Sequence, residues 1–264
     1  MNKEVRWQKI LETVSTNGSI TVGSICDQYG VSDMTARRDL VELDRAGLLR
    51  RIHGGAISGL GRSYEPQYQL RLNQQSHVKS AIAQRACDLV ADGDSLVLDV
   101  GTTTFAMVKG LQGKRNLTIL TASLQIAYEI ASTLAVGTDI RLIVTGGIVR
   151  PNELSMIGDL AERTFDDIHV DKVFMGVAGI SLEAGLTEYN LEDAMVKRHL
   201  LKNAHQLIIV ADSSKLGRTT FASVGDVSLV DTIITDQAAP NDFVQALGEM
   251  GIEVILVDSP PSQL

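Results

Sequence analysis

Glycines, hydroxyl side chains and charged side chains recur directly after five short apolar runs of this sequence. These groups occupy residues 99–104, 121–123, 145–147, 176–181 and 212–215. Backbone N–H groups of a glycine turn, hydroxyls and a lysine can together bind an anion. We therefore expect a phosphate group to bind where these turns meet.

The candidate ligand residues divide into two chemical groups. The turn from Gly101 to Thr104 offers backbone donors and three hydroxyls to a phosphate, and Lys197 or Lys215 could supply the countercharge. Three carboxylates could accept hydrogen bonds from the hydroxyls of a sugar. Small polar residues also end strands in proteins that bind nothing there, but five such turns favour a ligand site. The full set is Asp99, Gly101, Thr102, Thr103, Thr104, Thr121, Ser123, Gly146, Gly147, Gly179, Glu188, Glu192, Lys197 and Lys215.

Positioning these turns together requires a sheet whose strands end at one edge. Strand-like runs alternate with helical patterns, such as the one that carries Val78, Ile82 and Ala86. This alternation predicts an α/β domain with a mainly parallel sheet covered by helices. Ligands bind to such a sheet in the crevice outside the carboxyl ends of its strands. The expected strands are 95–99, 117–121, 139–145, 171–177, 206–211, 231–235 and 252–257.

The motifs of several common cofactor and catalytic sites are missing. Gly113 and Lys114 lack the earlier glycine of a phosphate-binding loop, and no Gly-x-Gly-x-x-Gly occurs. The five histidines do not have the spacing of zinc ligands. Cys26 and Cys87 are far apart and are expected to be buried thiols. We expect no catalytic residue, no metal and no cofactor.

The first sixty residues have the pattern of a winged helix-turn-helix. Helices are expected at residues 3–16, after Thr21 as N-cap and after Ser32 as N-cap. In the third helix, Ala36, Leu40 and Leu43 would point inward and leave a polar face outside. Residues 48–57 then read as two short strands around a His-Gly-Gly turn, which would form a wing.

An exposed Thr-Ala-Arg-Arg segment near a helix start suits the major groove of DNA. Arginine can donate two hydrogen bonds to guanine, and the wing could follow the sugar-phosphate backbone. The alternative is a protein-interaction module whose arginines are only solvated. The candidate DNA contacts are Ser32, Thr35, Arg37, Arg38, Arg50, Arg51 and His53.

The charge distribution supports this division of the chain. Residues 1–62 carry nine Lys and Arg against seven Asp and Glu, a net +2, whereas residues 63–264 carry 15 against 25, a net −10. A local positive surface is sufficient for phosphate contact. We expect a winged helix-turn-helix at residues 1–57, a linker at 58–75 and an α/β sensor at 76–264. The start of the chain has no apolar signal region and no long apolar run follows, so we expect a cytoplasmic protein without a membrane partner.

The same residues resemble the DeoR family of bacterial regulators of sugar metabolism. Arg6, Ile10 and Val14 match its first signature, the segment 32–40 matches its Thr-x-Arg-x-Asp block, and His53 begins the wing motif His-Gly-Gly-Ala. The segments Asp-x-Gly-Thr-Thr, Thr-Gly-Gly, Gly-x-x-Gly-Ile and Asp-Ser-Ser-Lys look like its sensor domain. The resemblance covers nearly the whole chain. One departure is Ala122, where the family often has Asn, and this difference bears on the choice of effector.

The resemblance implies a sensor related to ribose-5-phosphate isomerase and glucosamine-6-phosphate deaminase. It implies a phosphorylated sugar as effector, held by the turns named above, and a repressor of a sugar-catabolism operon that the effector releases. A homodimer or homotetramer would bind double-stranded operator DNA at two half-sites. The main alternative is an isomerase-like enzyme in which the same carboxylates and lysines move a proton. A scaffold protein is a third class. The helix-turn-helix favours the regulator, because a sensor needs an output domain.

Overall fold

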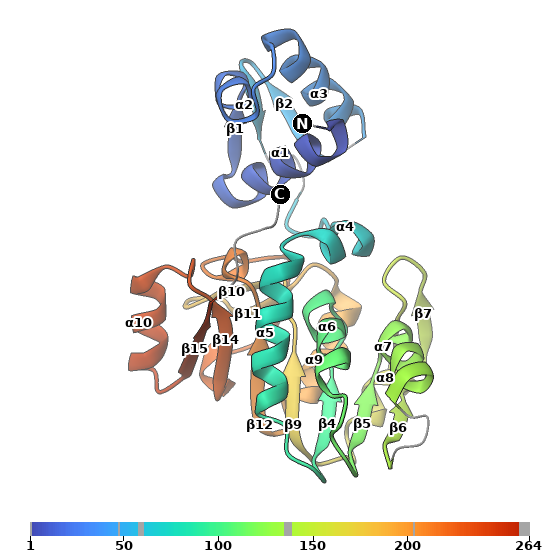
Figure 1. Cartoon of the computed structure of the whole chain (residues 1–264). Helices are drawn as coiled ribbons and strands as arrows, with labels where there is room; N and C mark the ends of the chain where they lie inside the picture. The colour runs from blue at the N-terminus through green and yellow to red at the C-terminus, as the bar shows by residue number, and fades with distance from the viewer. Residues whose placement is uncertain (1, 47, 58–60, 135–138, 203, 259–264) are drawn as a thin grey trace. The chain divides into compact units, whose positions relative to one another are not determined.

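The chain divides into two compact units, Met1–Tyr64 and Glu65–Leu264. The computed structural model describes residues 2–46, 48–57, 61–134, 139–202 and 204–258, although not the side chains of residues 15–17. Among these residues, no helix combines the length and the apolar character needed to cross a membrane. Figure 1 shows the order of the elements along the chain.

The smaller unit contains three helices and a three-stranded antiparallel sheet. Each helix begins at a side-chain cap, because Asn2, Thr21 and Ser32 accept hydrogen bonds from backbone N–H groups of the first turn. The strand order is β1-β3-β2, with the wing formed by β2 and β3. The elements are α1 Lys3–Asn17, β1 Ser19–Thr21, α2 Val22–Tyr29, α3 Asp33–Arg45, β2 Arg50–Ile52 and β3 Gly55–Ile57.

A seven-stranded sheet with only parallel pairings forms the centre of the larger unit. The strand order is β15-β14-β12-β9-β4-β5-β6, so β4 and β9 lie next to each other in the middle. The strands are β4 Ser95–Leu98, β5 Thr118–Thr121, β6 Arg141–Val144, β9 Val170–Met175, β12 Ala204–Val210, β14 Thr232–Asp236 and β15 Glu253–Val257.

Helices and short strands connect these seven strands. The helices are α4 Tyr68–Asn73, α5 Ser76–Asp88, α6 Thr102–Gly110, α7 Leu124–Glu129, α8 Asp159–Thr164, α9 Leu191–Leu200 and α10 Asn241–Glu249, with shorter turns η1 Ile130–Leu134, η2 Ser213–Lys215 and η3 Val227–Leu229. A hairpin consists of β7 Ile148–Arg150 and β8 Ser155–Ile157, and a second antiparallel sheet consists of β10 Gly179–Ser181, β11 Gly185–Glu188 and β13 Ala222–Gly225.

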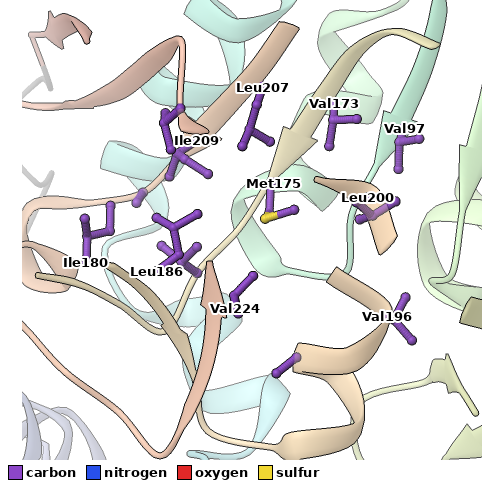
Figure 2. Close-up of a cluster of buried hydrophobic side chains, with 14 of the residues drawn as sticks. Val97, Val173, Met175, Ile180, Leu186, Val196, Leu200, Leu207, Ile209 and Val224 are labelled. Carbon is purple, nitrogen blue, oxygen red and sulfur yellow. The ribbon is translucent and has the colours of Figure 1, made fainter. Parts of the chain in front are cut away.

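The two faces of the parallel sheet carry separate apolar cores because side chains alternate along a strand. In β4, Leu96 and Leu98 pack into the cluster that contains residues of α5, α6 and α7. Val97 faces the other cluster, which contains residues of α8, α9 and the small sheet β10-β11-β13. Figure 2 shows this second cluster, with Val97, Val173 and Met175 from the large sheet near Leu200 of α9.

The α/β class, the winged helix-turn-helix and the mainly parallel sheet are confirmed. All seven predicted strands are present within one or two residues of their expected ends, because apolar β-branched runs bounded by turns are a strong signal. The range 58–75 contains helix α4, whose Tyr68 is buried, and the contact pattern divides the chain between Tyr64 and Glu65. Residues 58–60 of that range lie outside the described residues.

Candidate DNA-binding surface and candidate ligand site

Helix α3 presents a polar face above a buried apolar one. Ala36, Leu40 and Leu43 are fully buried, as the sequence pattern predicted. Arg37 and Arg38 are exposed on the opposite face, and Thr35 is half-buried with its hydroxyl 2.9 Å from that of the capping Ser32. The first two turns therefore carry hydroxyls, free backbone donors and two guanidinium groups, all of which can contact a DNA backbone or a base edge.

The two arginines of α3 differ in their surroundings. The Nε of Arg37 lies 2.5 Å from the carboxylate of Asp33, one helical turn earlier, and this hydrogen bond lowers the pKa of Asp33. Both side chains are about half exposed or more, so this pair contributes little to stability. Among the described residues, Arg38 has no ion-pair partner. Its guanidinium is therefore available to a ligand without breaking an internal contact.

A buried ion pair fixes α1 against α3. Arg6 donates from Nε to Asp39 at 2.6 Å, and the indole N–H of Trp7 donates to the same carboxylate at 2.9 Å. The hydrogen bond with Asp39 raises the pKa of Arg6, so this guanidinium stays charged. Arg6 and Asp39 are both signature positions of the sequence, but their spacing of 33 residues gave no indication that they pair.

The His-Gly-Gly motif of the wing has a geometric cause. Gly54 has a φ of 82°, which glycine adopts without strain. At Gly55 a Cβ would lie 2.1 Å from the carbonyl oxygen of Ile20, because β3 packs against β1. Arg50, Arg51 and His53 are exposed on this hairpin. The motif therefore allows a tight turn that displays two arginines and a histidine.

In the larger unit, the structure brings Asp99, Glu188 and Lys197 together at the carboxyl end of β4. The Nζ of Lys197 lies 2.9 Å from Asp99 and 2.6 Å from Glu188, and it donates to the carbonyl of Gly176 at 2.5 Å. We call these three side chains the Lys197 cluster. All of them are buried. Burial opposes the charged form of Lys197, but the charges of Asp99 and Glu188 outweigh it, so the pKa of Lys197 is raised.

The glycine–threonine turn lies at the start of α6, directly after Asp99. Gly101 is the N-cap, and Thr102, Thr103 and Thr104 form the first turn of this nine-residue helix. The hydroxyl of Thr104 donates to the Gly101 carbonyl at 3.0 Å and is fully buried. It is thus engaged within the turn. The hydroxyls of Thr102 and Thr103 and the first backbone N–H groups remain as the donors of this turn among the described contacts.

Several other predicted ligand residues have structural roles of their own. Thr121 accepts from the backbone of Ser123 at 3.0 Å, and Ser123 caps α7. A Cβ at Gly147 would lie 2.5 Å from the Ile157 carbonyl, and one at Gly179 would lie 2.4 Å from the Arg218 carbonyl. Small residues at these positions therefore follow from local packing. Gly146, next to Gly147, is exposed.

Glu192 and Lys215 do not belong to the Lys197 cluster. Glu192 is exposed in the first turn of α9. Lys215 is half-buried in η2 near the buried carboxylate of Asp212. Burial alone would raise the pKa of Asp212, but the charge of Lys215 and a hydrogen bond from Ser214 lower it overall. The positive charge of Lys215 therefore already interacts with the carboxylate of Asp212.

Sequence reasoning missed a second group of ionisable side chains, which we call the Arg150 cluster. Its members are Glu65, Arg71, Arg150, Glu153 and Asp193. Arg150 at the end of β7 pairs with Glu65 at 2.5 Å and with Asp193 of α9, while Arg71 of α4 pairs with Glu153. These partners come from three separate segments, residues 65–73, the β7–β8 hairpin and α9, so no local motif could reveal them.

Comparison with known proteins agrees with this architecture. The family described as "DeoR-like helix-turn-helix domain" matches residues 6–59, and the one described as "DeoR C terminal sensor domain" matches residues 74–237. The HTH-type transcriptional repressor GlcR of Bacillus subtilis is 34% identical over 258 residues, covering 98% of both chains. The glycerol-3-phosphate regulon repressor of Escherichia coli is 30% identical over 256 residues, covering 97% of this chain and 100% of that protein.

Solved structures resemble the chain more weakly. Ribose 5-phosphate isomerase A of Methanocaldococcus jannaschii aligns with 54% of this chain and 55% of its own, at 17% identity and a TM-score of 0.39. A likeness of this size carries no functional argument, and these curated relatives are named repressors rather than enzymes. Two family matches and full-length relatives at 30% identity or more agree: the chain belongs to the DeoR family of transcriptional regulators.

Proposed function

We propose that the chain represses an operon of sugar or polyol-phosphate metabolism and leaves its operator when a phosphorylated sugar binds to the larger unit. The observation that carries the proposal is that one chain contains both a helix that exposes Arg37 and Arg38 and a buried carboxylate–lysine cluster beside a helix N-terminus. The names of the relatives support the same reading, because one is a glycerol-3-phosphate regulon repressor.

For the DNA-binding role, we assign residues 1–57 as the reading domain. Arg38 would contact a base edge, since it has no internal ion pair to give up. Arg37, held by Asp33, and Ser32 with Thr35 would contact phosphates at the helix start. Arg50, Arg51 and His53 would follow the backbone beside the groove.

For the effector role, the phosphate would bind at the first turn of α6, with the half-buried Lys215 as its countercharge. The sugar hydroxyls would face Asp99 and Glu188, whose charges Lys197 balances. Thr121, Ser123, Gly146, Gly147 and Gly179 would shape the site, and Glu192 would lie at its margin. We place the protein in the cytoplasm with its operator, as a homodimer or homotetramer that spans two half-sites.

The test combines DNA binding with a ligand screen. Purified protein is titrated with a labelled DNA fragment from upstream of its own gene, and a thermal-shift screen uses ribose 5-phosphate, glucose 6-phosphate, fructose 1-phosphate and glycerol 3-phosphate beside their unphosphorylated forms. We expect one phosphorylated compound to raise the melting temperature and to weaken DNA binding about 5- to 150-fold. Failure to bind the fragment at low salt, together with turnover of a sugar phosphate, would overturn the proposal.

The recognition helix has its own variant. Arg38→Ala should weaken binding to the fragment by about 1 to 3 kcal/mol in a fluorescence-anisotropy titration, because a base contact is lost. Arg163→Ala is a matched control, since Arg163 lies exposed on α8 of the larger unit in a surface ion pair. Equal affinity of the two variants would remove Arg38 from the interface.

A further inference from the structure

The Arg150 cluster holds the segment with which the larger unit begins. Glu65 is the first residue of that unit, and it accepts hydrogen bonds from Arg150 at 2.5 Å and from Arg71 at 3.4 Å. Arg71 of α4 also donates from Nε to the Pro66 carbonyl at 3.0 Å and pairs with Glu153. Charged contacts therefore tie residues 65–73 to the β7–β8 hairpin and the turn within it.

Arg150 connects this segment to helix α9. Its Nη2 donates to Glu65 and its Nη1 donates to Asp193, so one guanidinium bridges two carboxylates from distant parts of the sequence. The side chains of all three are less than a fifth exposed. Ser155 adds a hydrogen bond to Asp193 at 3.3 Å. Little water is therefore present to replace either partner if one contact breaks.

Helix α9 carries both clusters. Asp193 and Lys197 are four residues apart, which places them on the same side of the helix one turn from each other. Lys197 is the cation of the Lys197 cluster, paired with Asp99 and Glu188. The charges of Glu188 and Lys197 both act on Asp193. The ion pairs of Lys197 and the ion pair between Asp193 and Arg150 are therefore anchored one turn apart on the same helix.

The Arg150 cluster contains unequal numbers of carboxyl and guanidinium groups. Among the described residues, Glu65, Glu153 and Asp193 form ion pairs with Arg71 and Arg150, so three carboxyl groups share two guanidiniums. A guanidinium that turns further toward one carboxylate leaves another buried carboxylate less well paired, which is strongly unfavourable. Salt-bridge networks with two discrete arrangements are one kind of element that carries allosteric coupling in proteins.

We propose that Glu65, Arg150 and Asp193 are positioning residues that couple occupancy of the Lys197 cluster to residues 65–73, and thereby to operator binding. The inference rests on the proposed function, and it adds the route by which a ligand acts on the start of the larger unit. A ligand that hydrogen-bonds to Asp99 or Glu188 alters the pairing of Lys197. Asp193 then holds Arg150 more or less strongly, and Arg150 releases or tightens its contact with Glu65.

The test measures coupling separately from binding. Operator affinity is determined with and without the phosphorylated sugar that shifts the wild-type melting temperature most, and ligand affinity is determined by calorimetry. In Glu65→Gln and Arg150→Gln we expect ligand affinity and ligand-free operator affinity within about threefold of wild type, with the ligand effect on operator affinity reduced to less than twofold. Arg163→Gln, which removes an exposed ion pair, is the control and should keep the full ligand effect. If the ligand changed operator affinity as much in Glu65→Gln and in Arg150→Gln as in wild type, the proposal would be overturned.

A second measurement decides the inference even if the proposed function fails. A double-mutant cycle with Glu65→Gln and Glu188→Gln follows the unfolding of the full chain in urea, with neither DNA nor ligand present. Each single change multiplies the unfolding equilibrium constant by some factor. If Glu65 and Glu188 are coupled through the relay formed by Arg150 and Asp193, the factor for the double variant should differ at least threefold from the product of the two single factors. For the control pair Glu65→Gln and Arg163→Gln, the factor for the double variant should agree within twofold with the product of the two single factors. Independent effects of Glu65 and Glu188 would exclude the relay, whereas a wild type that ignores every sugar phosphate would exclude the proposed effector alone.

Discussion

Individual ion pairs of this molecule contribute very differently to its stability, and the difference depends on how deeply each pair is buried. Asp33 and Arg37 form an exposed pair, which solvent screening leaves with little effect on stability. Arg6 and Asp39 are enclosed, with side chains only 8% and 4% exposed, and Trp7 adds a third contact. Removing one partner of a buried ion pair leaves the other charge in an environment that solvates it poorly.

Asp39→Ala should therefore lower the free energy of unfolding of the smaller unit by about 3 to 5 kcal/mol. Trp7 is the only tryptophan of the chain and lies in that unit, so its fluorescence during urea unfolding reports this unit directly. Asp33→Ala, which removes an exposed ion pair, is the control and should unfold at a urea concentration much closer to that of wild type. If the two variants unfolded at the same urea concentration, the buried pair would have no special role.

The carboxyl group of Asp193 predicts a pH dependence. Burial raises its pKa to about 7, although Arg150 acts in the opposite direction. Between about pH 4 and pH 7 the folded protein keeps a proton that the unfolded chain has lost, so this group makes the free energy of unfolding fall as the pH rises, by at most about 1.4 kcal/mol per pH unit. In thermal melts at pH 5 to 8, the stability of wild type relative to Asp193→Asn should decrease with pH. Asp159→Asn, at an exposed position, controls for the substitution itself, and a constant difference would contradict the assignment.

At the level of elements, the sequence pattern predicted the strands of the parallel sheet and the two wing strands beside the His-Gly-Gly turn, and missed other three-residue strands. The strands of the parallel sheet were visible because each is an apolar run closed by a turn. Three-residue strands such as β1 and β7 leave too few positions for a pattern. Asp99, Glu188 and Lys197 were predicted as site residues and do lie together, but the Arg150 cluster depends on tertiary contacts between three segments and has no sequence signature.

The contact between β1 and β3 makes Gly55 the most sensitive position of the wing. Gly55→Ala would place a methyl group 2.1 Å from the Ile20 carbonyl, so the strands must separate or shift. We expect a loss of about 1 to 3 kcal/mol of stability in the Trp7-monitored unfolding and weaker DNA binding. Gly23→Ala in α2 has free space, with its closest atom at 3.9 Å, and should be neutral or stabilising. Equal stability of the two variants would show that β3 can move away without cost.

For the whole molecule, the charge difference between the two ends makes DNA binding strongly dependent on salt. Residues 1–62 carry a net +2 and the remainder a net −10, so attraction to the duplex is local. If Arg51 contacts a phosphate, Arg51→Gln should lower the slope of log affinity against log salt concentration by about 1, because one fewer counter-ion is released. Titrations between 50 and 200 mM salt, with Arg163→Gln as control, give this slope, and a slope equal to wild type would place Arg51 away from the backbone.

Each strand of the smaller unit has found its partner by Ile57, since β1, β2 and β3 pair only with one another. The parallel sheet of the larger unit is complete only when β15, ending at Val257, pairs with β14. During translation the smaller unit can thus fold before most of the larger unit has been synthesised. A message cut short after the first quarter would accordingly yield a DNA-binding fragment that no metabolite can control.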